Sequence, residues 1–207
     1  MALGRVIRIF ASPATAPRGL TCDGKNLWHT DLGTDRIYRI NPLSGGVTHS
    51  FPTPGTLPED LAWDGRTLWL CERQTGLIYQ INPVTGQVIL SFASPGAAPS
   101  GLAWDGRMLW HADPSTNLIY HINPITGQVT RSFASPAALA RGLAWDGAKL
   151  WHVNETTRRI YQIDPETEQV TRSFGCFGLA PLGLTCDGRT LWHCDDNTNL
   201  IYQIAVN

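Results

Sequence analysis

Charged residues are scarce in this chain. Lys, Arg, Asp and Glu make up 16% of its 207 residues, and the formal net charge is −1. Soluble domains usually carry about a quarter of charged residues. Nucleic-acid binding draws on a surplus of Lys and Arg that displaces counterions from phosphates. The composition therefore argues against a nucleic-acid partner.

Long apolar stretches are also missing. No run approaches the ~20 residues that a membrane-spanning helix needs. The opening segment, Met-Ala-Leu-Gly-Arg-Val-Ile-Arg-Ile-Phe, lacks the basic, apolar and small-residue regions of a secretory signal. We therefore expect no membrane partner and a cytoplasmic location.

Cysteine spacing of the metal-binding kind is absent. The five cysteines never form a Cys-x-x-Cys pair, so we expect reduced thiols. Four histidines recur at one repeat position, but equivalent atoms on sheets packed ~10 Å apart cannot all reach one zinc ion at ~2.1 Å. We therefore expect no metal site and no cofactor. These residues are Cys22, Cys71, Cys176, Cys186 and Cys194, and His29, His111, His152 and His193.

What the chain does contain is one unit repeated five times. Tryptophan recurs every 41 residues without insertion or deletion, and phenylalanine keeps the same interval. A period of about 40–45 residues with four short apolar runs is typical of a propeller blade, because one small sheet cannot cover its own apolar faces. The sequence predicts an all-β, five-bladed β-propeller with four antiparallel strands per blade. The repeated residues are Trp28, Trp69, Trp110, Trp151 and Trp192, and Phe10, Phe51, Phe92, Phe133 and Phe174.

Two turn sequences recur within the unit. The first contains Asp-Gly in every copy, a pair that accepts positive φ at both centres of a tight hairpin. The second reads Asn-Pro-Val-Thr-Gly over residues 82–86, where proline favours a type I turn and glycine takes the left-handed position. Glu168 replaces that glycine in the fourth copy, so we expect backbone strain there.

The repeat is cut so that the two chain ends share one blade. Residues 6–10 align with the fourth strand of the unit, residues 47–51, whereas the chain stops shortly after the third strand, residues 200–204. Residues 1–10 should therefore complete the last blade and remove an exposed sheet edge. We expect one domain over residues 1–207, and a monomer.

Most repeated aromatic and polar residues are expected to be structural. The five tryptophans should pack between blades, although indoles stacked on sugars are an alternative, and the five tyrosines should pack likewise. An acidic or amide residue, followed three residues later by threonine, favours a loop held by side-chain hydrogen bonds over a ring of ligand-binding oxygens. The tyrosines are Tyr38, Tyr79, Tyr120, Tyr161 and Tyr202, and the loop residues are Asp31, Glu72, Asp113, Asn154 and Asp195.

Function in a repeat protein usually resides where the copies differ. They differ most just before the first strand, at the presumed mouth of the central channel. The second copy deviates furthest, with Asp60 in place of glycine and Leu70 in place of histidine. The predicted site is Glu59, Asp60, Glu72 and Arg73 facing Arg18 and Arg141, with Ser100 and Leu182 at the equivalent positions of the remaining copies. Drift on a solvated rim is the alternative.

The fifth copy differs in another way. Its link carries Phe177, Leu179 and Leu182, which would either form an exposed contact patch or fold inward over the channel mouth. Cys22 and Cys186 replace a tryptophan found in the other three copies, which indicates a seam with smaller side chains. A disulfide there would require Cα atoms within about 7 Å of each other.

The unit Gly-Leu-Ala-Trp-Asp-Gly-x-x-Leu-Trp, followed by Ile-Tyr-x-Ile-Asn-Pro-x-Thr-Gly-x-Val, resembles the blades of the bacterial propeller group that includes glutamine cyclotransferase-like and YncE-like proteins. The resemblance covers the whole chain. It implies five blades and, for a cyclotransferase, cyclisation of N-terminal glutamine by channel carboxylates, a role that only Glu59 or Asp60 resembles. Five-bladed lectins of the tachylectin kind would instead imply one sugar site per blade. Such similar copies also resemble an amplified or engineered repeat.

Fold alone does not determine function. We expect a binding or interaction scaffold that contacts a small molecule, a carbohydrate or a peptide at the variable mouth, without being an enzyme. A cyclotransferase-like enzyme with Glu59 or Asp60 as its catalytic residue is the first alternative. A structural or engineered ring without a ligand is the second.

Overall fold

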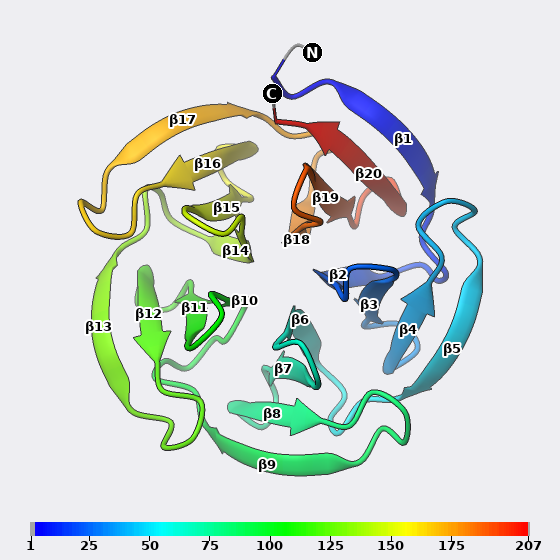
Figure 1. Ribbon diagram of the computed structural model, residues 1–207, viewed down its shortest axis with the longest axis horizontal. Helices are drawn as coiled ribbons and strands as arrows, with labels where there is room; N and C mark the ends of the chain where they lie inside the picture. Colours follow the sequence, from blue (N-terminus) through cyan, green and yellow to red (C-terminus); the bar gives the residue numbers. More distant parts are fainter. Residues whose placement is uncertain (1–2, 207) are drawn as a thin grey trace.

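The chain forms five four-stranded antiparallel sheets arranged around a central axis (Figure 1). This computed structural model describes residues 3–206; residues 1–2 and 207, which belong to the predicted domain and closure segment, lie outside the described residues. The predicted five-bladed all-β propeller is confirmed. Within the described residues there is no helix that could span a membrane.

Each blade is a meander that runs from the axis to the perimeter. Blade one contains β2 (Pro17–Cys22), β3 (Leu27–Asp31), β4 (Arg36–Ile40) and β5 (Val47–Pro52). Blade two contains β6 (Pro58–Trp63), β7 (Leu68–Glu72), β8 (Leu77–Ile81) and β9 (Val88–Ala93). Blade three contains β10 (Gly101–Trp104), β11 (Leu109–Asp113), β12 (Leu118–Ile122) and β13 (Val129–Ala134). Blade four contains β14 (Ala140–Trp145), β15 (Leu150–Asn154), β16 (Arg159–Ile163) and β17 (Val170–Gly175).

Blade five is assembled from both ends of the chain. It contains β18 (Pro181–Cys186), β19 (Thr190–Asp195) and β20 (Leu200–Ala205), and β1 (Val6–Ala11) pairs antiparallel with β20 as its outer strand. The Gly4 N–H donates to the Ala205 carbonyl at 2.9 Å, as the Gly86 N–H donates to Asn82 in an uninterrupted turn. The predicted closure is confirmed, and β1 and β20 lie side by side in Figure 1.

The Asp-Gly turns are built differently from the prediction. Only the glycine takes positive φ, 88° at Gly24, so the expectation of positive φ at both residues is wrong for the aspartate. Asp23 instead uses its carboxylate. Its Oδ1 accepts the N–H of Lys25 at 2.8 Å and that of Asn26 at 2.7 Å, and its Oδ2 accepts the indole N–H of Trp28 at 2.9 Å. The indole contact recurs in all five blades at 2.7–3.1 Å.

The second turn matches its prediction. Gly45, Gly86 and Gly127 have φ of 71° to 73°, and Glu168 is held in the same left-handed region at 61°. Glu168 therefore adopts a conformation that favours glycine.

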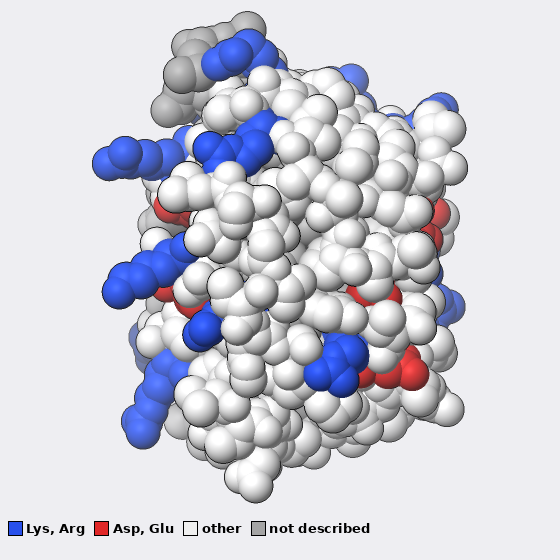
Figure 2. Space-filling model, turned by 90° about the vertical axis from the view of Figure 1, so that its right-hand side faces the viewer, with Lys and Arg blue, Asp and Glu red and all other residues white. Residues whose placement is uncertain are grey.

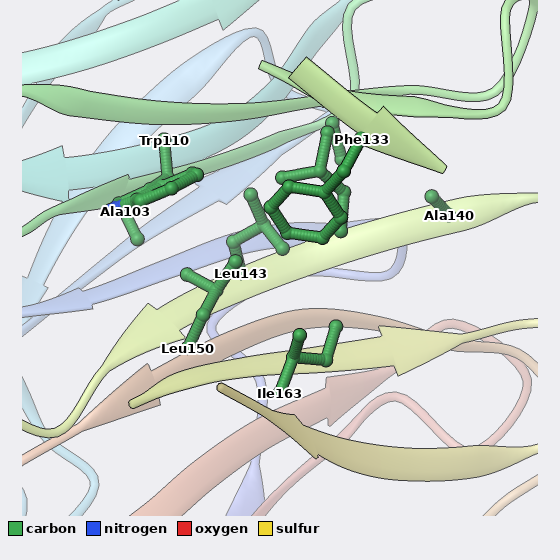
Figure 3. Close-up of a cluster of buried hydrophobic side chains, with 9 residues drawn as sticks. Ala103, Trp110, Phe133, Ala140, Leu143, Leu150 and Ile163 are labelled. Atoms are coloured by element: carbon green, nitrogen blue, oxygen red, sulfur yellow. The ribbon is translucent and has the colours of Figure 1, made fainter. Parts of the chain in front are cut away.

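On the side of the ring that Figure 2 shows, charged side chains are scattered among uncharged ones. The core lies between neighbouring blades. Figure 3 shows one such cluster, in which Trp110 and Phe133 of blade three pack near Leu143 and Leu150 of blade four. The five repeated tryptophans are only 1–3% exposed, which confirms the packing interpretation and leaves no indole face for a sugar. The five tyrosine hydroxyls each bond a threonine hydroxyl at 3.0–3.1 Å.

Candidate binding site at the channel mouth

The five inner strands β2, β6, β10, β14 and β18 surround the axis (Figure 1). We call the end with the Asp-Gly turns the turn end, and the end with the blade-to-blade links (residues 12–16, 53–57, 94–100, 135–139 and 176–180) the loop end. The inner strands approach closely: a Cβ on Gly19 would lie 2.5 Å from the Asp60 Cα, and one on Gly183 would lie 2.5 Å from the Arg18 carbonyl. Glycine is therefore required at this level in four blades, and blade two alone carries a side chain there.

That side chain, Asp60, lies on the axis. Its Oδ1 accepts the N–H of Leu20 from blade one at 3.1 Å. Its Oδ2 accepts the N–H of Leu102 from blade three at 3.0 Å and that of Leu143 from blade four at 3.3 Å. Because these donors belong to both neighbouring blades and to one across the ring, the carboxylate closes the channel. Burial raises the pKa of Asp60 well above its usual value, and N–H donors, including that of Leu61, act against this rise.

Above Asp60, at the loop end, the predicted mouth residues come together. A cavity of about 10 Å³, the room of about one water molecule, is lined by residues from every blade. The lining residues are Arg18, Glu59, Asp60, Ser100, Arg141, Gly142 and Leu182. Six of the eight candidate residues therefore meet at one place.

A second ring of variable residues surrounds the first, and the sequence reasoning missed most of it. Arg18 pairs with Asp196 at 3.3 Å, Glu59 with Arg73 at 3.9 Å, and Arg141 with Glu155 at 2.7 Å. The outer partners occupy one repeat position that differs in all five copies, and this variation was the signal that could have identified them. The outer ring is Leu32, Arg73, Pro114, Glu155 and Asp196.

Glu59 is the central carboxylate of this surface. Burial raises its pKa, with a further upward contribution from Glu155, while Arg18, Arg141 and Arg73 lower it. Its side chain remains 12% exposed, and that of Arg73 is 50% exposed. The mouth thus carries positive and negative side chains that lie next to one another.

Glu72 does not join the mouth. It is fully buried, and its carboxylate accepts the N–H of Leu57 at 2.7 Å and that of Thr75 at 2.6 Å. Asp31 accepts the N–H groups of Ala16 and Thr34 in the same way. The predicted loop-holding role of this repeat position is confirmed, and Glu72 performs it in blade two.

The repeated histidines are tied into the backbone. His29 contacts the Gly19 carbonyl through Nδ1 at 2.9 Å and the Ser12 hydroxyl through Nε2 at 3.0 Å, and His111 has equivalent partners. Burial lowers the pKa of His29, His111, His152 and His193 to about 4, so these rings are neutral. Residues 3–206 contain no group of three or more His, Cys, Asp or Glu arranged to hold a metal ion.

The apolar link of blade five folds mostly inward. Phe177 stacks on Tyr202 with ring centroids 5.8 Å apart, and Leu182 is buried, whereas Leu179 is 61% exposed. All five cysteines are free, as expected. At the seam between blades five and one, a groove of about 300 Å³ opens beside Cys22, where three other blades have tryptophan.

Comparison with known proteins supports the fold. Neither the family models nor the curated proteins gave a match. The chain is similar to the glutaminyl cyclase of Myxococcus xanthus, with a TM-score of 0.84 and 14% identity over 97% of this chain and 95% of that one. It is also similar to an inactive virginiamycin B lyase of Staphylococcus aureus with quinupristin (TM-score 0.59, 23% identity, 96% and 69% covered). A chain of a nidogen–laminin complex has a TM-score of 0.65 and 22% identity, with 94% and 77% covered. These TM-scores show a shared propeller fold among proteins of varied function.

Proposed function

We propose that this protein is a binding scaffold that presents the loop end of the ring, centred on the channel mouth, to a peptide or protein segment. One observation carries the proposal: the two rings around the mouth are among the positions at which the five copies differ most, while their framework is nearly identical. Packing within equal blades does not account for this difference. Selection for a partner at the mouth would.

The geometry favours a contact surface over a pocket. Small-molecule sites typically enclose about 300–1,000 Å³, whereas the mouth cavity is about 10 Å³. Three ion pairs connect the inner and outer rings. A peptide that lies across this surface needs no deep cavity, because it can pair with exposed charges such as Arg73.

Apolar side chains lie around the charged mouth. Leu57, Leu139 and Leu179 belong to three different links at the loop end and are 38%, 41% and 61% exposed. Exposed leucines provide contact area, while charges select the partner and its orientation. This combination supports an amphipathic peptide over a carbohydrate.

The test is a selection of random peptides from a display library on the native protein, followed by calorimetry. We expect one peptide per ring. Binding should weaken about tenfold in Arg73→Glu, the equivalent of about 1.4 kcal/mol. Lys25→Glu, at the turn end, is the matched control and should bind normally. Peptides whose binding weakens only in Lys25→Glu would place the site at the turn end. A sugar that binds on a glycan array and titrates to five equivalent sites in calorimetry would place binding in the individual blades.

The cyclotransferase alternative has its own test. Asp60 already accepts N–H groups from several strands, and Glu59 lies 3.9 Å from Arg73, so both carboxylates already have partners. We expect no cyclisation of peptides that begin with glutamine. Turnover that disappears in Glu59→Gln would establish the enzyme in place of the scaffold.

A further inference from the structure

A second cavity lies on the turn-end side of Asp60. It measures about 120 Å³ and is lined by inner-strand residues of all five blades, among them Leu61, Leu102 and Leu143. The N–H groups of these three leucines bind the Asp60 carboxylate, so the cavity begins at the level of that carboxylate. Asp60 therefore separates it from the mouth.

The walls of this cavity are backbone edges. In an antiparallel strand, the N–H and C=O of one residue point to the same side. Leu20, Leu61, Leu102 and Leu143 direct their N–H groups to Asp60 on the axis, and their carbonyl oxygens therefore face the axis as well. The carbonyls of Leu61, Leu102 and Leu143, three residues that line the cavity, thus face the axis from three blades.

The charge of Asp60 lacks a protein partner in the described part of the chain. No Lys, Arg or His of residues 3–206 forms an ion pair with it, and the nearby Arg18 and Arg141 pair with Asp196 and Glu155. A buried anion without a counter-charge is costly, so such a group takes up a proton or associates with a cation. Carbonyl oxygens are the ligands that hard cations prefer.

We infer that the channel binds one compact monovalent cation, of the size of K⁺ or NH₄⁺, on the axis at the turn-end side of Asp60. Leucine carbonyls coordinate the ion, and the carboxylate balances its charge. A single carboxylate matches a single positive charge, whereas divalent ions are usually held by several carboxylates. Trp63, Trp104 and Trp145 line the cavity at its turn-end side, where indole rings favour a cation.

Thermal unfolding tests the site in the full chain. At one ionic strength, the melting temperature is compared in KCl, NH₄Cl, choline chloride and tetramethylammonium chloride. A cation at about five times its dissociation constant should raise the melting temperature by roughly 2–4 °C relative to the bulky ions. A larger rise in KCl than in NH₄Cl, or the reverse, identifies the preferred ion.

Variants distinguish ion binding in the channel from ion effects at the protein surface. Asp60→Asn and Asp60→Gly, the latter giving blade two the residue of the other blades, should lose the response. Glu59→Gln, on the loop-end side of Asp60, should keep the response to the cation. Equal melting temperatures of the native protein in all four salts would overturn the inference, as would an unchanged response in Asp60→Asn.

A direct measurement on the native protein covers the case in which the variants do not fold. Bound ¹⁵N-ammonium should give a resolved NMR signal with cross-relaxation to the amide protons of Leu20, Leu102 and Leu143. A protonated Asp60 carboxyl at pH 7 in the presence of K⁺, with no such signal in ammonium, would show that a proton neutralises the charge and would reject the cation.

Discussion

Each repeat position occurs in five nearly equal environments, so one unusual residue can be compared with its counterparts in the same molecule. Asp60 is the clearest case. Glycine at this position lets inner strands approach within contact distance, and the aspartate of blade two uses the space at the axis to bind backbone N–H groups of several blades. A single substitution in one copy thereby changes the centre of the whole ring.

Glu168 is a second unusual residue, and it should destabilise its turn. It has a φ of 61°, where the other four blades have glycine with φ of 71° to 78°. In three of those blades a Cβ would come within 2.8–2.9 Å of a phenylalanine of the preceding blade. Because left-handed backbone costs a non-glycine residue roughly 1–2 kcal/mol, we expect Glu168→Gly to raise the free energy of unfolding by about 1 kcal/mol in urea denaturation. Gly86→Glu should lower it comparably. Equal or lower stability of Glu168→Gly would mean that this turn accommodates the side chain.

Cys176 leaves one ring nitrogen of a buried histidine without a hydrogen-bond partner. Serine occupies its position in three other blades and contacts the histidine Nε2 at 3.0–3.2 Å. In blade five, the Nε2 of the buried His193 has no hydrogen-bond partner. The Cys176 N–H bonds the Arg158 carbonyl as the serines bond their counterparts, so its backbone is in place. We expect Cys176→Ser to stabilise the protein by about 1 kcal/mol, measured by urea denaturation.

The reverse substitution is the control for Cys176→Ser. Ser94→Cys should remove the contact to His111 and destabilise the fold by a similar amount, about 1 kcal/mol. If Cys176→Ser leaves the stability unchanged while Ser94→Cys lowers it, the stacking of His193 on Tyr202, which itself stacks on Phe177, holds the imidazole away from the hydroxyl.

At the scale of strands, β1 is the element on which ring closure depends. It contributes the outer strand of blade five, and Phe10 packs 5.9 Å from Trp192. Deleting residues 1–10 would expose the edge of β20 and uncover the blade-five core. We expect insoluble or open-chain material, judged by the soluble fraction and by size-exclusion chromatography. A well-folded monomer from the truncated chain would contradict the closing role of β1.

A circular permutant is the matched control for this deletion. Joining residues 207 and 1 through a short turn and opening the chain at residues 83–85 keeps every strand while moving the break. Because the native break already reproduces the hydrogen bonds of an intact turn, we expect the permutant to fold to a soluble ring. Its failure together with the truncation would mean that the position of the break matters more than β1 itself.

Local patterns predicted most elements of this fold. The strands, the closing β1 and the left-handed Glu168 follow from residues that are neighbours in the sequence or lie one period apart. Asp60 was identified as unusual, but its partners Leu102 and Leu143 lie 42 and 83 residues away. Arg18 meets Asp196 across 178 residues. Such contacts exist only after the ring closes, so the inner structure of the mouth could not be predicted from local spacing.

At the scale of the whole molecule, four buried histidines connect ring stability to pH. Their pKa is about 4 in the folded protein, compared with ~6.5 in an unfolded chain. The unfolded state therefore binds protons first as the pH falls, and stability present above pH ~6.5 is lost progressively toward pH 4. Glu59 and Asp60 have raised pKa values and act in the opposite sense. In this pH range the unfolded state then binds about two to four more protons than the folded state. The free energy of unfolding therefore changes by about 3–5 kcal/mol per pH unit.

This dependence predicts loss of the fold in mild acid, because domains are typically stable by only 5–15 kcal/mol. The measurement is the free energy of unfolding in urea from pH 7.5 to 4.5. Blade two supplies a matched variant, since it has Thr53 and Leu70 where blade three has Ser94 and His111. The double variant Ser94→Thr/His111→Leu removes one titrating ring and should reduce the slope by about one proton, about 1.4 kcal/mol per pH unit. An unchanged slope in the double variant would mean that His111 does not contribute to the pH dependence. Stability of the native protein that rises on acidification would mean that carboxyl protonation outweighs the buried imidazoles.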